Sequence, residues 1–105
     1  MLYHKIVDLT NTTKNICLSF IVIKEISVTT TKDKDIVRTY LISDETGSIE
    51  YSAWNIQFED DDLINITGGY TSLFKGKTRL FNSKNSMINR NGKIRKVFSL
   101  EPFIN

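Results

Sequence analysis

Aromatic and cationic side chains are interleaved in one short stretch, residues 68–81, which reads GGYTSLFKGKTRLF. It holds three rings, three cations and no acid: Tyr70, Phe74, Phe81, Lys75, Lys77 and Arg79. Rings that face solvent offer stacking surfaces for unpaired bases, and nearby cations neutralise phosphates. The stretch therefore indicates a surface that binds a single-stranded nucleic acid, with Lys75, Arg79 and the following Lys84 close to the phosphates.

A further ring comes from residues 48–54, SIEYSAW, where apolar and polar side chains alternate. In a strand, alternate side chains point to opposite faces, so Ile49, Tyr51 and Ala53 are predicted to face the core. Trp54 then shares the outer face with serines and a glutamate, a position that folding alone explains poorly. The alternative is that the alternation is lost at the strand end and Trp54 caps the core.

The same reasoning predicts the faces of residues 68–81. If Leu73 and Leu80 point inward, the outward set is Tyr70, Phe74, Arg79 and Phe81. Paired glycines inside a strand often mark a bulge or a bend, so 68–69 are expected to reset which face the later residues occupy.

Charge is segregated along the chain. Residues 1–62 contain six Lys/Arg and eleven Asp/Glu, whereas residues 63–105 contain eight Lys/Arg and a single acid, Glu101. This asymmetry favours a polyanionic partner, although a basic solvated surface is an equally simple interpretation. The acids of residues 59–62 are expected to be solvated. They could attract a cation, but they lack the glycine and the spacing of a calcium loop.

The composition argues against several other classes of function. With one histidine, His4, and one cysteine, Cys17, the sequence suggests no Ser-His or Cys-His catalytic arrangement, and it excludes an internal disulfide and a zinc site built from Cys and His. We expect no enzyme activity and no cofactor, and we assign no role to either residue. There is no apolar run of about 18 residues and no secretory signal, so we expect an intracellular protein without a membrane span.

The element pattern is all-β. Strands are predicted over residues 15–28, 36–43, 48–54, 63–74 and 78–83, with tight turns at 44–47 and 75–77 and a short helix or loop over 55–62. We expect one domain over residues 1–105 with its core over about 14–84; a basic C-terminal extension, 85–105, would close the domain through a short strand or helix at 97–105. Five strands with a long curved first one fit an OB-fold barrel, although periodicity alone does not exclude an SH3-like barrel.

Three segments in order, FIVIKEISVTTTKD, VRTYLISDETGSIEYSAW and GGYTSLFKGKTRLF, resemble a known family. This family consists of OB-fold proteins that bind single-stranded DNA and form the B subunit of SOSS, the eukaryotic sensor of single-stranded DNA. The resemblance implies base stacking on Trp54 and Phe74, with Tyr70 and Phe81 in the same groove. It also implies polar contacts to DNA from Asn55 and Lys84, and backbone contacts from Lys32 and Arg38.

The sequence departs from that family at three of these positions. The family usually has Asp where Asn55 stands, Tyr where Phe81 stands and Arg where Lys84 stands; Phe81 keeps the stacking surface and loses a hydroxyl, and Lys84 loses the planar fork of arginine.

The resemblance further implies a nuclear protein of DNA repair and genome maintenance. Its partners would be a large scaffold subunit shared with the Integrator complex and a small third subunit. Two alternatives remain open from the residues themselves: an OB-fold module that binds a peptide or an acidic protein, and a domain that binds single-stranded RNA.

Overall fold

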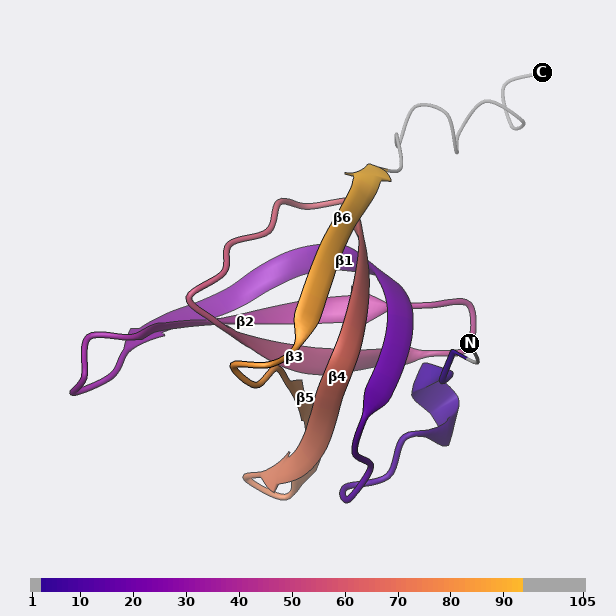
Figure 1. Cartoon of the computed structure of the whole chain (residues 1–105), viewed down its shortest axis with the longest axis horizontal. Coiled ribbons are helices and arrows are strands. Elements are labelled where there is room, and N and C mark those ends of the chain that lie inside the picture. The colour runs from indigo at the N-terminus through magenta and orange to yellow at the C-terminus, as the bar shows by residue number, and fades with distance from the viewer. Residues whose placement is uncertain (1–2, 94–105) are drawn as a thin grey trace.

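A closed five-stranded β-barrel forms the body of the protein, and a sixth strand extends the same sheet by pairing along the edge of one barrel strand (Figure 1). The structure is a computed structural model that describes residues 3–93. Its elements are η1 (Ile6–Asp8), β1 (Ile16–Thr30), β2 (Ile36–Ser43), β3 (Ser48–Trp54), β4 (Asp62–Phe74), β5 (Lys77–Phe81) and β6 (Met87–Lys93). The strand order is β1-β2-β3-β5-β4, and a β1–β4 pairing closes the ring. This is the predicted OB-fold, and the segment between β3 and β4 is a loop.

Strand β1 is long and curved, so it serves two sides of the barrel (Figure 1). Residues 16–21 pair with β4, and residues 21–30 pair with β2. Two register shifts in β1, next to Ile23 and Ile26, are bulges that bend the strand. Past the first bulge every β1 residue is exposed, because the hairpin projects beyond the barrel. We call residues 23–37 the β1–β2 arm.

The core follows the predicted alternation. In β3, Tyr51 and Ala53 are fully buried and Ile49 packs against the core, whereas Trp54 lies on the other face. The buried apolar side chains are Ile6, Ile16, Leu18, Phe20, Val22, Tyr40, Ile42, Tyr51, Ala53, Phe58, Ile64, Ile66 and Leu80. The loop after β3 is held to this core because the backbone N–H of Phe58 donates to the Tyr40 hydroxyl at 2.8 Å.

The glycine pair forms the expected bulge in β4. Ile16 pairs with Gly69 and Cys17 with Thr67, so Gly68, at φ 86°, has no direct partner in β1. Inward-facing residues change from even to odd numbers across this point: Ile66 is buried before the bulge, and Gly69 and Thr71 are buried after it.

The bulge brings Tyr70 and Phe74 to the outer face, as predicted. Leu80 is buried, also as predicted, but the expectation for Leu73 is wrong. Its side chain is 55% exposed because this end of β4 runs past the closed part of the barrel.

Strand β6 comes from the segment predicted to be a basic extension. It pairs antiparallel with β4, from Met87 opposite Thr67 to Lys93 opposite Asp62. Its sequence, MINRNGK, shows no apolar alternation, which is consistent with a strand that is exposed along almost its whole length. The strand is held in place by backbone hydrogen bonds to β4. The predicted closing element at residues 97–105 lies outside the described residues.

An ionic cluster joins β6 to the end of the loop before β4. Asp62 is fully buried; its Oδ2 accepts from the Glu59 N–H at 2.9 Å and lies 3.0 Å from Arg90 Nε. Lys93 Nζ lies 2.6 Å from Glu59 Oε1 and 3.6 Å from Asp62 Oδ1, and the hydrogen bond to Glu59 raises the pKa of Lys93. The expectation that all of these acids are solvated is therefore wrong for Asp62.

Within residues 3–93, no helix is long and apolar enough to span a bilayer.

Candidate nucleic-acid interface

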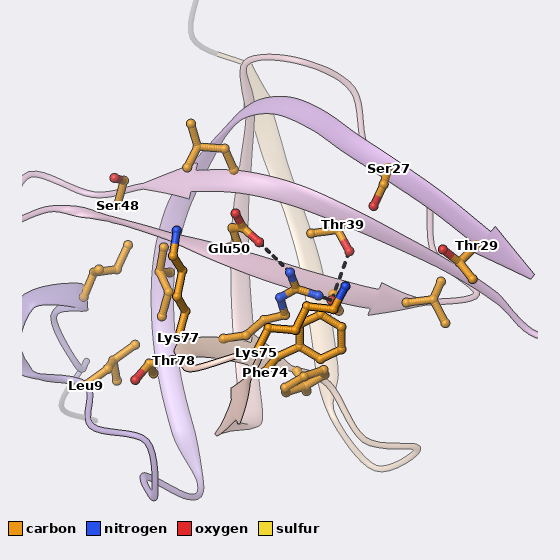
Figure 2. Close-up of a pocket in the computed structure, with 17 residues that line it drawn as sticks. Leu9, Ser27, Thr29, Thr39, Ser48, Glu50, Phe74, Lys75, Lys77 and Thr78 are labelled. Atoms are coloured by element: carbon orange, nitrogen blue, oxygen red, sulfur yellow. Dashed lines mark hydrogen bonds and ion pairs between the residues drawn. The ribbon is translucent and has the colours of Figure 1, made fainter. Parts of the chain in front are cut away.

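A groove of about 970 Å³ runs across the outer face of the arm, β2, β3 and β5. Alternation brings hydroxyl and aliphatic side chains to its floor: Ser27 and Thr29 from β1, Val37, Thr39 and Leu41 from β2, and Ser48 and Ser52 from β3. Figure 2 shows Ser27 and Thr29 on the arm side and Phe74 with Lys75 on the β4–β5 side. The face of β2 and β3 with the adjoining loops is the surface that OB-folds use for oligonucleotides.

Trp54 lies at the end of β3, on the face that carries Ser52 and in register with Val37 of the groove floor. Its side chain is 39% exposed, so a large part of the indole is open to a ligand. The position is fixed through Asn82, whose Oδ1 accepts from the Trp54 backbone N–H at 3.1 Å and from the Tyr51 hydroxyl at 3.0 Å. Nothing in the sequence marks Asn82 for this role, because its partners lie about thirty positions away in the chain.

Tyr70 and Phe81 form a stacked pair on neighbouring strands. They are directly opposite each other in the β4–β5 pairing, with ring centroids 5.5 Å apart and planes 20° apart. Phe81 lines the groove and is half-buried, whereas Tyr70 is 38% exposed. Mutual stacking holds both rings at the surface without burying them in the core.

Phe74 is 41% exposed and lies over a cation of the adjacent strand. The Arg79 guanidinium carbon lies 4.0 Å from its ring centroid, and Lys75 Nζ lies 5.4 Å from it. The same guanidinium makes an ion pair of 2.6 Å with Glu50 and donates to the Ser52 hydroxyl at 3.2 Å. Arg79 was predicted to lie near phosphates, which stays a prediction; in the structure it lines the groove and contacts Glu50, Ser52 and Phe74.

The lysines predicted to contact DNA are all exposed, but they occupy different places. Lys75 lines the groove, as does Lys77. Lys84 follows β5 in the β5–β6 loop, and Lys32 belongs to the turn at the tip of the arm. The cationic groups thus lie at the β4–β5 turn, beyond β5 and at the arm tip.

Arg38 and Asn55, both expected to contact DNA, bind neighbouring protein groups in the structure. Val37 and Thr39 line the groove, so Arg38 between them points to the opposite face, where it makes a 3.1 Å ion pair with Glu25. Asn55, at φ 60°, accepts from the Ile36 N–H at 2.9 Å and donates to Asp35 at 3.1 Å. Its amide therefore ties the end of β3 to the base of the turn before β2.

Among residues 3–93, no three His, Cys, Asp or Glu side chains are grouped so that they could hold a metal ion. The nitrogen Nδ1 of His4 accepts from the Cys17 backbone N–H at 3.1 Å, which gives that pair a structural contact at the start of β1.

No protein-family model matches the sequence. Solved structures do match its fold. The OB domain of a Thermoplasma acidophilum protein superposes with a TM-score of 0.75 at 22% identity, covering 89% of this chain and 91% of that one. A domain of replication protein A from Methanococcus maripaludis gives 0.72 at 19% identity, over 88% and 98%.

A replication factor A related protein from Methanobacterium thermoautotrophicum gives a TM-score of 0.69 at 21% identity, over 85% of this chain and 90% of that one. At these identities the likeness concerns the fold. The chain is an OB-fold that resembles domains of replication protein A in its architecture.

Proposed function

We propose that this OB-fold binds single-stranded DNA without catalysis, by stacking bases on exposed rings and neutralising phosphates with lysines. The observation that carries the proposal is the groove itself. Half-exposed rings and the exposed Lys75 and Lys77 meet at a hydroxyl-lined surface on the β2–β3 face. The likeness to domains of replication protein A supports the same assignment.

Truncating the rings tests the stacking directly. We expect Trp54→Ala and Phe74→Ala each to weaken binding of a fluorescent oligo-dT by about 1–3 kcal/mol, the contribution of one stacked base. Tyr3→Ala is the matched control, because Tyr3 is an exposed ring outside the groove. Unchanged affinity in both variants, Trp54→Ala and Phe74→Ala, when each is folded, would refute the proposal.

Salt and competitors separate single-strand binding from the alternatives. The logarithm of the binding constant should fall linearly with the logarithm of salt concentration, by about 0.7 for each phosphate neutralised. Excess duplex should not displace the oligo-dT, and a matched RNA oligomer in the same competition decides between DNA and RNA. Absence of binding to any oligonucleotide at low salt would favour a protein-interaction module.

Membership of a SOSS-type complex, a role in DNA repair and nuclear localisation form the finer part of the proposal, which rests on the sequence resemblance. Co-expression with an Integrator-type scaffold subunit, followed by size-exclusion chromatography, tests the first of these. Separate elution would leave a DNA-binding domain without that assembly. Imaging of the tagged chain tests the localisation.

A further inference from the structure

Arg79 differs from the other cations of the groove in what surrounds it. Its side chain is only 18% exposed, and one guanidinium contacts a carboxylate, a hydroxyl and an aromatic ring together. We infer that Arg79 is a positioning residue which, anchored by Glu50, holds the Phe74 ring where a base can stack. This inference rests on the proposed function and assigns separate roles to the cations within it.

The place of Phe74 explains why it needs such a support. It is the last residue of β4 and is followed by a turn in which Lys75 and Gly76 have φ angles of 51° and 83°. The preceding residue, Leu73, is exposed, so the barrel core does not hold this end of the strand. A guanidinium 4.0 Å from the ring centroid supplies a stacking partner in place of core packing.

The geometry of Arg79 in turn depends on β3. Glu50 and Arg79 are direct partners in the parallel β3–β5 pairing, and Nη2 lies 2.6 Å from Glu50 Oε1. Nη1 donates to the hydroxyl of Ser52, two residues along the same strand. A planar guanidinium can make both contacts while one of its faces lies against the ring, which a lysine ammonium cannot do.

This arrangement predicts that removing the Glu50 carboxylate changes the affinity for DNA in the direction opposite to the one that electrostatics alone would give. Glu50 is an acidic side chain that lines the groove, and the other charged residues of the lining are cations. Electrostatics alone would therefore make its removal strengthen the binding of a polyanion. If Glu50 positions Arg79 and thereby Phe74, its removal weakens binding instead.

The test is a salt titration of a labelled 16-nucleotide oligo-dT with the full chain. We expect Glu50→Ala and Arg79→Ala each to weaken binding about three- to tenfold with the salt slope unchanged. Because Arg79 acts through Phe74, the double variant Arg79→Ala/Phe74→Ala should bind as Phe74→Ala alone does. Lys75→Ala should instead lower the slope by about 0.7, as expected for a lost phosphate contact. Glu45→Gln, an exposed acid outside the groove, serves as the matched control and should change nothing.

Several outcomes would overturn the inference. Tighter binding by Glu50→Ala, or a slope reduced by about 0.7 in Arg79→Ala with losses that add to those of Phe74→Ala, would make Arg79 a phosphate ligand. Arg79→Lys keeps the charge and loses the fork, so full recovery of affinity would show that charge alone matters. Thermal unfolding of each variant confirms that it is folded.

A measurement without DNA separates this inference from the proposed function. In the free protein, the Phe74 ring current should shift the Arg79 side-chain NMR signals upfield, and both Phe74→Leu and Glu50→Ala should abolish that shift. If the wild-type chain bound no oligonucleotide, the proposed function would fail while this spectrum still showed whether the three side chains form the assembly. Signals insensitive to both substitutions would refute the assembly.

Discussion

The residues predicted to contact DNA differ in whether other groups of the protein already bind their side chains. Trp54 and Lys75 present exposed groups, whereas Arg38 and Arg79 are each paired with a carboxylate. A cation in an ion pair must lose its partner before it can bind a phosphate at full strength. Residue type therefore indicates a candidate contact, and the neighbouring side chains determine how strongly that residue can bind a ligand.

At Gly69, too, the neighbouring side chains determine what a substitution does, here through packing. A Cβ at this position would lie 3.1 Å from Ile66 Cδ1 and 3.3 Å from both Leu80 Cδ1 and the Phe81 carbonyl oxygen. We expect Gly69→Ala to lower the free energy of unfolding by about 1–3 kcal/mol, measured by urea denaturation, because the core there is already filled.

Gly47→Ala is the control for that measurement. Its added Cβ would meet Ile6 at an ordinary 3.8 Å, so we expect a change within about 0.5 kcal/mol. Equal effects of the two substitutions would contradict a crowding effect specific to Gly69.

Among the strands, β6 buries the fewest side chains. It is exposed along most of its length, and its cations form ion pairs with Glu59 in the loop before β4 and with Asp62, the first residue of β4. Part of the charge segregation seen along the sequence is therefore neutralised inside the fold. The positive charge at the groove comes instead from the β4–β5 turn and its neighbours.

Asp62 makes β6 docking testable. We expect Arg90→Met, which keeps an apolar stem, to destabilise the protein by about 2 kcal/mol, because it removes the nearest cation from a buried carboxylate. The value lies below that of a fully buried pair, since the Arg90 side chain is 52% exposed. Urea denaturation of Lys84→Met, with the same change of charge on an exposed loop, is the comparison; equal stability of the two variants would contradict a specific ionic role.

For the whole molecule, ionisable groups set limits to stability at both ends of the pH range. Burial raises the pKa of Tyr40 and Tyr51, so the stability linked to their neutral forms is present below the ordinary tyrosine pKa and is lost as the pH rises through the folded values. Partial burial acts to raise the pKa of Asp44, but hydrogen bonds from Thr46, Ile6 and Gly47 outweigh it and lower that pKa. The stability from Asp44 is thus present above the ordinary carboxyl pKa and is lost as the pH falls through the lowered value.

Asp44→Asn should therefore lower the free energy of unfolding only at pH values at which the wild-type carboxylate is charged. We expect a loss of about 1 kcal/mol at pH 7, at the low end for hydrogen bonds to a charged group because solvent reaches the site. The urea midpoints of the variant and the wild type should converge as the pH falls through the lowered pKa of Asp44. A difference that stays constant with pH would assign the effect to geometry; Glu45→Gln is the control.

Local patterns were enough to predict much of this molecule. The strands at 36–43 and 48–54 were predicted with the bounds observed, and the alternation in β3 correctly placed Trp54 outside and Tyr51 inside. The glycine pair correctly marked the bulge that turns Tyr70 outward. These features depend on the two-residue period and on backbone sterics, which neighbouring residues determine by themselves.

Contacts between distant segments decided the rest. Strand β6 carries no apolar period and is ordered by pairing with β4, while Leu73 follows the alternation but lies past the end of the barrel. The partners of Arg79 are equally remote, since Glu50 is 29 positions away and becomes its neighbour only when β3 and β5 pair. Residue types and strand faces follow from short-range sterics and hydrophobic periodicity, whereas the pairing of each charge depends on which strands the closed barrel brings together.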